Sequence, residues 1–233
     1  MLAMFGLIAG AAAAAYAGYA TMGPTSQLYG SSFLGVPGSK LLALTYDDGP
    51  NDAHTPALLD LLARHQVKAT FFLIGRYVAQ RPDLVRRTRQ EGHAIGNHTF
   101  SHPLLIFTSS AQLRRELEDT DKAIADAIGG HDGLFRPPFG GRRPGTFAAV
   151  RERGMTPVMW TVTCYDWNAK DADSIERRAI QGIRGGDIIL LHDGSHLKMG
   201  ADRSLTVEAT DRIIRRYKEA GYRFVTVPEM MKG

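Results

Sequence analysis

The ten-residue stretch LLALTYDDGP, residues 41–50, joins a short apolar run to two adjacent carboxylates and a Gly-Pro turn. The run from Leu41 to Tyr46 has the length of a buried β-strand, and Asp47 and Asp48 follow at its end. Farther along the chain, apolar runs of strand length alternate with segments of helical length. This alternation predicts a parallel β-sheet with helices packed against it.

Seven strands and six helices are expected. In the longest helical segment, Leu113, Leu117 and Ile124 recur at spacings that place them on one face of a 3.6-residue helix. The predicted strands are Leu41–Tyr46, Ala69–Ile74, His93–Asn97, Leu134–Arg136, Thr156–Val162, Asp187–Leu191 and Arg223–Val227. The predicted helices are Thr55–Arg64, Pro82–Glu91, Ser110–Ile128, Pro144–Arg153, Ala172–Ile183 and Ser204–Ala220.

Charged and histidine side chains follow the ends of at least five predicted strands. In a (β/α) barrel all such positions meet at the carboxyl-terminal mouth, where active sites are built, whereas an open sheet would scatter them. We therefore predict a single-domain α/β protein with a (β/α) barrel of seven strands, one fewer than the eight-stranded form. The side chains concerned are Asp47 with Asp48, His98 with His102, Arg136, Asp166 and His192.

Charge divides the chain near residue 40. The 233 residues include 28 Lys and Arg and 24 Asp and Glu, a net charge of +4, yet no charged residue or histidine precedes Lys40. Residues 1–22 resemble a secretory signal, with small residues near Ala15 and Ala20 that suit cleavage; an uncleaved hydrophobic anchor and a flexible leader are the alternatives. Residues 23–39, rich in Gly, Ser and Pro, are predicted to be a linker, and residues 40–233 the domain. We expect an exported protein with membrane or cell-wall association through the N-terminus.

Composition excludes several classes of partner and site. Cys164 is the single cysteine, so the chain has no intramolecular disulfide or CxxC metal site, and any metal must be held by histidines and carboxylates. The basic residues are dispersed pairs without interleaved aromatic residues, which argues against a nucleic-acid partner.

Two clusters suggest a metal site. His98 and His102 stand four residues apart, which in a helical turn would place both imidazoles on one side as metal ligands. One carboxylate of the Asp47-Asp48 pair would complete a site with an open position for water, while the other faces the reacting group. The alternatives are a solvated acidic turn or helix cap for the aspartates and a helix-capping or surface role for the histidines.

Three further clusters follow other strands. After Arg136, two prolines and a glycine fix a turn that could present the backbone N–H of Phe139 to a ligand, although such turns are common. Asp166-Trp167 places a charge beside a large ring, which is equally typical of a surface acid next to a core tryptophan. His192 ends an apolar strand, a suitable place for a general acid or base.

Together these five clusters resemble the motifs of the polysaccharide deacetylase family, carbohydrate esterase family 4, with its NodB homology domain. The matching segments are TYDDGP (45–50), HTFSH (98–102), RPPFG (136–140), DW (166–167) and LLH (190–192), and the resemblance extends from about Lys40 to Met231. It implies a distorted (β/α) barrel. It also implies that Asp48, His98 and His102 hold a divalent metal, with zinc expected and cobalt, nickel or iron as alternatives.

The resemblance implies roles for the other motif residues. Asp47 would deprotonate the attacking water, and Arg136 would pair with Asp47. The Phe139 N–H would stabilise the oxyanion, while His192 would protonate the leaving amine, with Asp166 orienting it. Two residues would line a pocket for the acetyl methyl group: Trp167 and Leu190.

The expected activity is metal-dependent hydrolysis of N-acetyl groups from amino sugars of a β-linked glycan, either peptidoglycan or chitin and its oligosaccharides, by a monomer. The alternatives are an O-acetyl esterase on a xylan-like glycan and a surface glycan-binding protein without turnover. Loops 169–173 and 196–203 are expected to decide substrate choice.

Overall fold

The computed structural model describes residues 14–233; residues 1–13, which belong to the predicted leader, lie outside the described range. Within residues 14–233, eight strands form one sheet in which all neighbouring strands are parallel. Seven of them follow the order β5-β4-β3-β2-β1-β7-β6, and β8 pairs with the first residues of β1. The strands are β1 Leu41–Gly49, β2 Thr70–Leu73, β3 Ala94–Asn97, β4 Leu134–Phe135, β5 Thr156–Pro157, β6 Val162–Thr163, β7 Asp187–His192 and β8 Arg223–Phe224.

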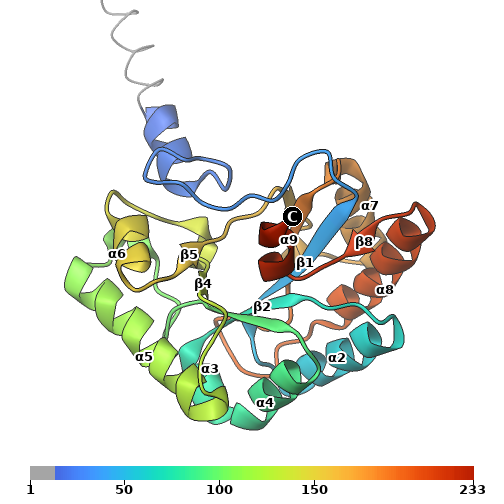
Figure 1. Cartoon of the computed structure of the whole chain (residues 1–233), viewed down its shortest axis with the longest axis horizontal. Helices are drawn as coiled ribbons and strands as arrows, with labels where there is room; N and C mark the ends of the chain where they lie inside the picture. Colours follow the sequence, from blue (N-terminus) through green and yellow to red (C-terminus); the bar gives the residue numbers. More distant parts are fainter. Residues whose placement is uncertain (1–13) are drawn as a thin grey trace, which may run out of the picture.

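The sheet curls around β1, whose residues after Leu41 are all buried (Figure 1). Among the described residues, the strands at the two ends of the path, β5 and β6, do not pair with each other, so the barrel is incomplete. The predicted distorted (β/α) barrel is therefore confirmed. Because all strands run in one direction, their carboxyl ends meet at one edge, and the register places Asp47 of β1 opposite His192 of β7.

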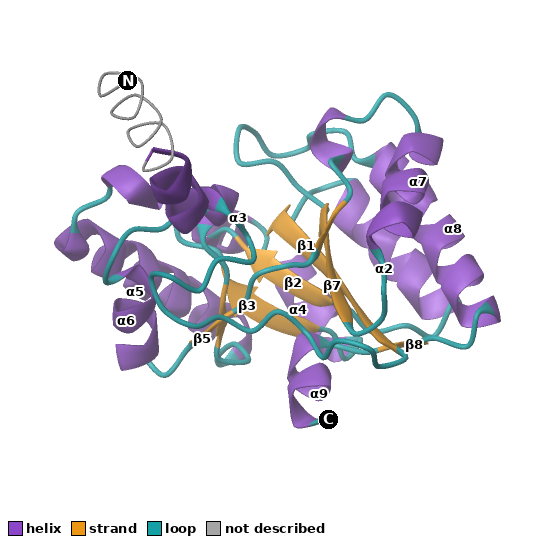
Figure 2. Ribbon diagram, turned by 90° about the horizontal axis from the view of Figure 1, so that it is seen from above, coloured by secondary structure: helices purple, strands orange, loops and turns teal. Residues whose placement is uncertain are grey.

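Helices flank the sheet, with α5 and α6 on one side and α7 and α8 on the other (Figure 2). Helix α5 begins at the predicted position, where Ser109 caps it, and ends before Gly129 in the left-handed conformation. Its apolar face, with Leu113, Leu117 and Ile124, is buried as predicted. The helices are α2 His54–Arg64, α3 Gly75–Gln80, α4 Pro82–Gln90, α5 Ser110–Ile128, α6 Thr146–Glu152, α7 Ala172–Gly182, α8 Ser204–Glu219 and α9 Val227–Lys232, with short turns η1 Leu105–Phe107, η2 Pro138–Gly140 and η3 Asp166–Asn168.

Two predicted strands differ from the observed ones. The segment Thr156–Val162 is interrupted after Pro157. At the interruption the Arg136 side chain donates to the carbonyls of Val158 and Met159 at 3.4 Å, and Val158 bridges to Phe33. The segment Arg223–Val227 ends as a strand at Phe224. There, a Thr226 capping box begins helix α9.

Residues 20–39, most of which were predicted to be a linker, contact the domain closely. Phe33 forms a parallel bridge with Val158 and Gly35 an antiparallel bridge with Asp187, so this segment lies across the incomplete side of the barrel. Figure 1 shows it in blue between the N-terminal helical residues and β1. No helix in the part of the chain that the structure describes is long and apolar enough to cross a bilayer.

Arg142 ties this N-terminal segment to the turn after β4. Its fully buried guanidinium donates to the carbonyl oxygens of Gly23, Ser26 and Gly140 at 2.6 to 2.8 Å. Its backbone N–H donates to the Thr21 carbonyl at 3.0 Å. One buried side chain therefore satisfies three carbonyl groups from two distant parts of the sequence.

We expect Arg142→Met to lower the free energy of unfolding by roughly 3 kcal/mol, because it leaves buried carbonyl groups without donors. Urea unfolding followed by circular dichroism measures the change. The exposed Arg215, changed to Met as a control, should alter stability by less than about 0.5 kcal/mol. An Arg142 variant as stable as the unmodified protein would show that water or a local shift replaces these bonds.

Candidate active site

The adjacent carboxylates at the end of β1 point to different partners. The register with β2 shifts between Asp47 and Gly49, and Asp48 adopts a left-handed backbone with φ of 73°. This irregularity turns the Asp47 carboxylate toward Arg136 and the Asp48 carboxylate toward His98 and His102. The two carboxylates can therefore serve different chemical roles.

The turn that carries His98 and His102 is not helical, so the predicted helical turn is wrong. Thr99 and His102 have φ angles of 66° and 62°, which reverse the chain and bring the two imidazole centroids to 4.9 Å. The turn is stabilised by a residue distant in the sequence: the carboxylate of Glu116 on α5 accepts hydrogen bonds from the N–H groups of Phe100 and Ser101. The spacing of His98 and His102 correctly predicted that they lie together, but the turn that brings them together is not the helical one expected.

Asp48, His98 and His102 can hold a metal ion: one ligand atom from each lies within 4.8 Å of the others. Oδ1 of Asp48 is buried, receives no hydrogen bond of normal geometry, and faces the Nε2 atoms of His102 and His98 at 3.1 and 3.6 Å. The Nδ1–H of His98 donates to the Arg136 carbonyl at 2.8 Å, which directs Nε2 toward the cluster. Two imidazoles and one carboxylate suit a divalent metal of the zinc type.

The protonation states also suit metal binding. Burial lowers the pKa of His98 to about 4, so its imidazole is neutral at neutral pH. Burial alone would raise the pKa of Asp48. Contacts with His102 and His196 outweigh burial and hold the pKa of Asp48 well below its usual value, so the carboxylate is ionised.

Asp47 is held by a buried cation. Arg136 is fully buried, and its Nη1 donates to Asp47 Oδ1 at 2.8 Å and to Thr45 Oγ1 at 2.7 Å. The guanidinium carbon lies 4.1 Å from the centre of the Phe72 ring. The second oxygen of Asp47, Oδ2, lies 3.7 Å from Nε2 of His98 and so faces the candidate metal-ligand cluster of Asp48, His98 and His102. Arg136 thus fixes one oxygen of this carboxylate and leaves the other available.

On the other side of the cavity, His192 and Asp166 form a coupled pair. The Nδ1–H of His192 donates to Asp166 Oδ1 at 2.9 Å, while Oδ2 accepts the backbone N–H of His192 and the hydroxyl of Thr206. Burial alone would lower the pKa of His192, but the attraction and hydrogen bond of Asp166 outweigh it and raise this pKa to about 9. His192 is therefore a cation at neutral pH.

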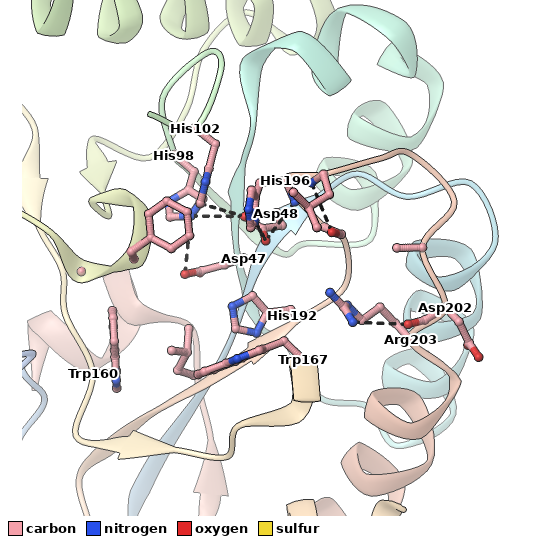
Figure 3. A pocket seen from close by; sticks show the side chains of 16 residues that line it. Asp47, Asp48, His98, His102, Trp160, Trp167, His192, His196, Asp202 and Arg203 are labelled. Carbon is pink, nitrogen blue, oxygen red and sulfur yellow. Dashed lines mark hydrogen bonds and ion pairs between the residues drawn. The ribbon is translucent and has the colours of Figure 1, made fainter. Parts of the chain in front are cut away.

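A cavity of about 540 Å³ connects these groups (Figure 3). Trp167, Leu190 and Trp160 supply apolar surface, and Trp167 packs edge-on against His192 with centroids 5.0 Å apart. Eight of the ten predicted site residues line the cavity. The other two, Arg136 and Asp166, lie behind Asp47 and His192 as their partners.

Non-glycine residues with left-handed backbone gather at this end of the sheet. Phe139 has φ of 57° within η2, and its ring contacts those of His102 and His196. Left-handed backbone is unfavourable for residues with a Cβ atom and marks functional positions more often than chance. The residues of this kind around the cavity are Asp48, Thr99, His102, Phe139 and Tyr165, while Gln66 lies elsewhere, after α2.

Sequence reasoning did not single out His196. Its ring stacks on His102 with centroids 4.6 Å apart and an interplanar angle of 16°. Its backbone N–H donates to Asp48 Oδ2 at 3.2 Å. The loop 196–203 was expected to shape the substrate site, but nothing in its sequence indicated contact with Asp48.

Comparisons with known proteins show the family to which the chain is similar. The family model described as polysaccharide deacetylase matches residues 35–158. A peptidoglycan-N-acetylglucosamine deacetylase of Bacillus cereus is 39% identical over 195 residues, which cover 83% of this chain and 89% of that protein. A chitooligosaccharide deacetylase of Rhizobium leguminosarum bv. trifolii is 35% identical, covering 80% of this chain and 89% of that protein.

A solved structure is also similar. The crystal structure of the Bc1960 peptidoglycan N-acetylglucosamine deacetylase superposes with a TM-score of 0.79 at 36% identity, covering 85% of this chain and 91% of that one. The chain therefore belongs to the polysaccharide deacetylase family.

Proposed function

We propose that this protein is a metal-dependent N-deacetylase that releases acetate from N-acetylated amino sugars of a β-linked glycan, either peptidoglycan or a chitooligosaccharide. The observation that carries the proposal is the placement of Asp47 and His192 on adjacent strands, opposite each other beside the cluster of Asp48, His98 and His102. A carboxylate on one side and a histidine cation on the other can remove and supply protons in the same hydrolysis.

Each of the surrounding residues has a role in this reaction. The divalent metal, when bound, supplies a water of lowered pKa and polarises the acetamide carbonyl. Asp47 accepts the proton of the attacking water at Oδ2, since Arg136 occupies Oδ1. The N–H of Phe139 stabilises the negative charge that develops on the carbonyl oxygen.

The leaving group needs a proton, and His192 provides it. Asp166 keeps the imidazole charged and fixes its orientation through Nδ1, so Nε2 is the donor to the departing sugar amine. Trp167 and Leu190 form the apolar wall against which the acetyl methyl group packs. We propose zinc as the metal, with cobalt, nickel or iron as alternatives that suit the same ligands.

The proposed place of action is outside the cytoplasm, next to a cell-wall glycan. The uncharged residues 1–39 support export, with association to membrane or wall through the N-terminus, and we propose that the protein acts as a monomer.

Acetate release tests the function directly. Metal-replete protein should release acetate from chitopentaose, from peptidoglycan, or from both, and chelation should abolish the release until zinc is restored. Absence of acetate from both glycans with metal-replete protein would reject N-deacetylation. Faster release from acetylxylan than from either glycan would instead favour the O-acetyl esterase.

The pH dependence of kcat should change when Asp166 is replaced. His192 must be protonated to act as the acid, so kcat should fall as pH rises through about 9. In Asp166→Asn the attraction is lost while burial remains, so this alkaline limb should move at least about 2 pH units lower. The measurement is kcat on chitopentaose between pH 5 and 10, with Asp173→Asn on the surface of α7 as the control. An unmoved limb in Asp166→Asn would show that another group is the acid.

A further inference from the structure

Arg203 is the one lysine or arginine among the residues that line the cavity in the part of the chain that the structure describes. Its guanidinium forms no ion pair with any carboxylate of residues 14–233. Nε donates to the carbonyl of Gly194 at 2.7 Å and Nη1 donates to the carbonyl of Asp202 at 3.3 Å. Because both acceptors are neutral carbonyl groups, the guanidinium is held in place without a hydrogen-bonded carboxylate.

The loop that carries Arg203 is fixed at several points. The hydroxyl of Tyr77 on α3 donates to the Ser195 carbonyl at 3.0 Å, and Arg76 donates to the His196 carbonyl. At the other end, Asn51 donates to the Ala201 carbonyl at 2.9 Å. The guanidinium is therefore positioned before any ligand arrives, which reduces the entropy lost on binding.

The hydrogen bond from Arg203 to the Gly194 carbonyl holds the guanidinium near His192, since Gly194 follows His192 by two residues. Figure 3 shows the guanidinium on the His192 side of the cavity, across from the metal-ligand cluster. The neighbouring acids have other partners: Asp202 is largely exposed and pairs with His54 at 3.3 Å, and Asp47 pairs with Arg136. An anion that enters beside His192 thus meets a guanidinium that no carboxylate group of the described residues contacts directly.

A fixed guanidinium at the edge of a sugar-binding cavity is suited to a carboxylate, which it can bind through two hydrogen bonds. The two candidate glycans differ in this group. In peptidoglycan alternate sugars carry a lactyl group, whose carboxylate is free and charged wherever the stem peptide has been removed, whereas a chitooligosaccharide is neutral. We propose that Arg203 forms a subsite for a carboxylate on the sugar next to the one that is deacetylated, so that the enzyme prefers the anionic glycan. This inference rests on the proposed function.

Three substrates of equal length test the subsite: a peptide-free peptidoglycan oligosaccharide, the same oligosaccharide with its carboxylates converted to methylamides, and a chitooligosaccharide. The full-length protein should have a kcat/KM about 10-fold higher on the anionic substrate than on its methylamide. Arg203→Gln should lose most of this preference, mainly through KM, and its loss on the anionic substrate should exceed that on the two neutral substrates at least about 5-fold.

Two further variants separate specific binding from general effects. Arg203→Lys should recover part of the preference, since it restores the charge without the planar fork. Lys198→Gln removes an exposed cation from the same loop and should leave the preference unchanged. Equal losses of Arg203→Gln on all three substrates, or an unmodified protein that does not distinguish the anionic substrate from its methylamide, would overturn the subsite. Failure of the proposed function would appear differently, as no acetate from any of the three.

Discussion

Replacing Asp47 with asparagine is expected to lower kcat on the order of 10³-fold while metal binding is retained. Asparagine keeps an oxygen that can accept from Arg136 Nη1, so the buried guanidinium keeps a partner and the fold should persist. It cannot take a proton at the position of Oδ2, which faces the metal-ligand cluster at 3.7 Å from His98. Turnover should therefore fail although the cavity retains its shape.

The experiment on Asp47 needs three measurements on one preparation. These are kcat on the better glycan substrate, the metal content by elemental analysis, and the thermal midpoint of unfolding. Asp202→Asn is the matched control, because its exposed carboxylate belongs to the same cavity and should change kcat less than about 3-fold. Full activity in Asp47→Asn would refute its assignment as the base.

The second large effect concerns the metal itself. Asp48→Ala should weaken zinc binding by more than about 100-fold, because it removes a negatively charged ligand, whereas loss of a group that only orients a ligand costs 10- to 100-fold. Acetate release should fall to background in parallel. Isothermal titration with zinc measures the affinity directly, independent of turnover.

Asp202→Asn again serves as the control and should bind zinc as the unmodified protein does. Adding zinc in large excess should restore part of the activity of Asp48→Ala if His98 and His102 still provide two ligands. A variant that binds one zinc with unchanged affinity would show that the ion lies elsewhere.

The sheet was predictable because its signals are local. Each long strand is a continuous apolar run, as in β1 and β7, and the apolar face of α5 repeats at helical spacing. Helix α3 was missed because six residues hold too few turns to show a period. The break between β5 and β6 was missed because the contacts there are not local: the Arg136 side chain donates to the Val158 carbonyl from 22 residues earlier in the chain.

In the site, too, the residue types were predictable from local sequence, whereas the contacts that position them were not. Residue types at strand ends indicated the proposed metal ligands and their neighbours, since parallel strands bring their ends together. The actual turn at His98 depends on Glu116 of α5, and the contact of His196 with Asp48 depends on a loop held by α3. Such contacts join residues 15 to 148 positions apart, so no short window of sequence displays them.

The left-handed residues around the cavity have a consequence for protein engineering. At Asp48 and His102 glycine would relieve roughly 1 kcal/mol of backbone strain, yet the proposed metal site uses both side chains. A screen for thermal tolerance would therefore find apparent improvements here that abolish turnover, whereas Gln66 offers the same relief far from the chemistry. Selection for heat resistance and selection for activity should thus act on different residues that share one backbone conformation.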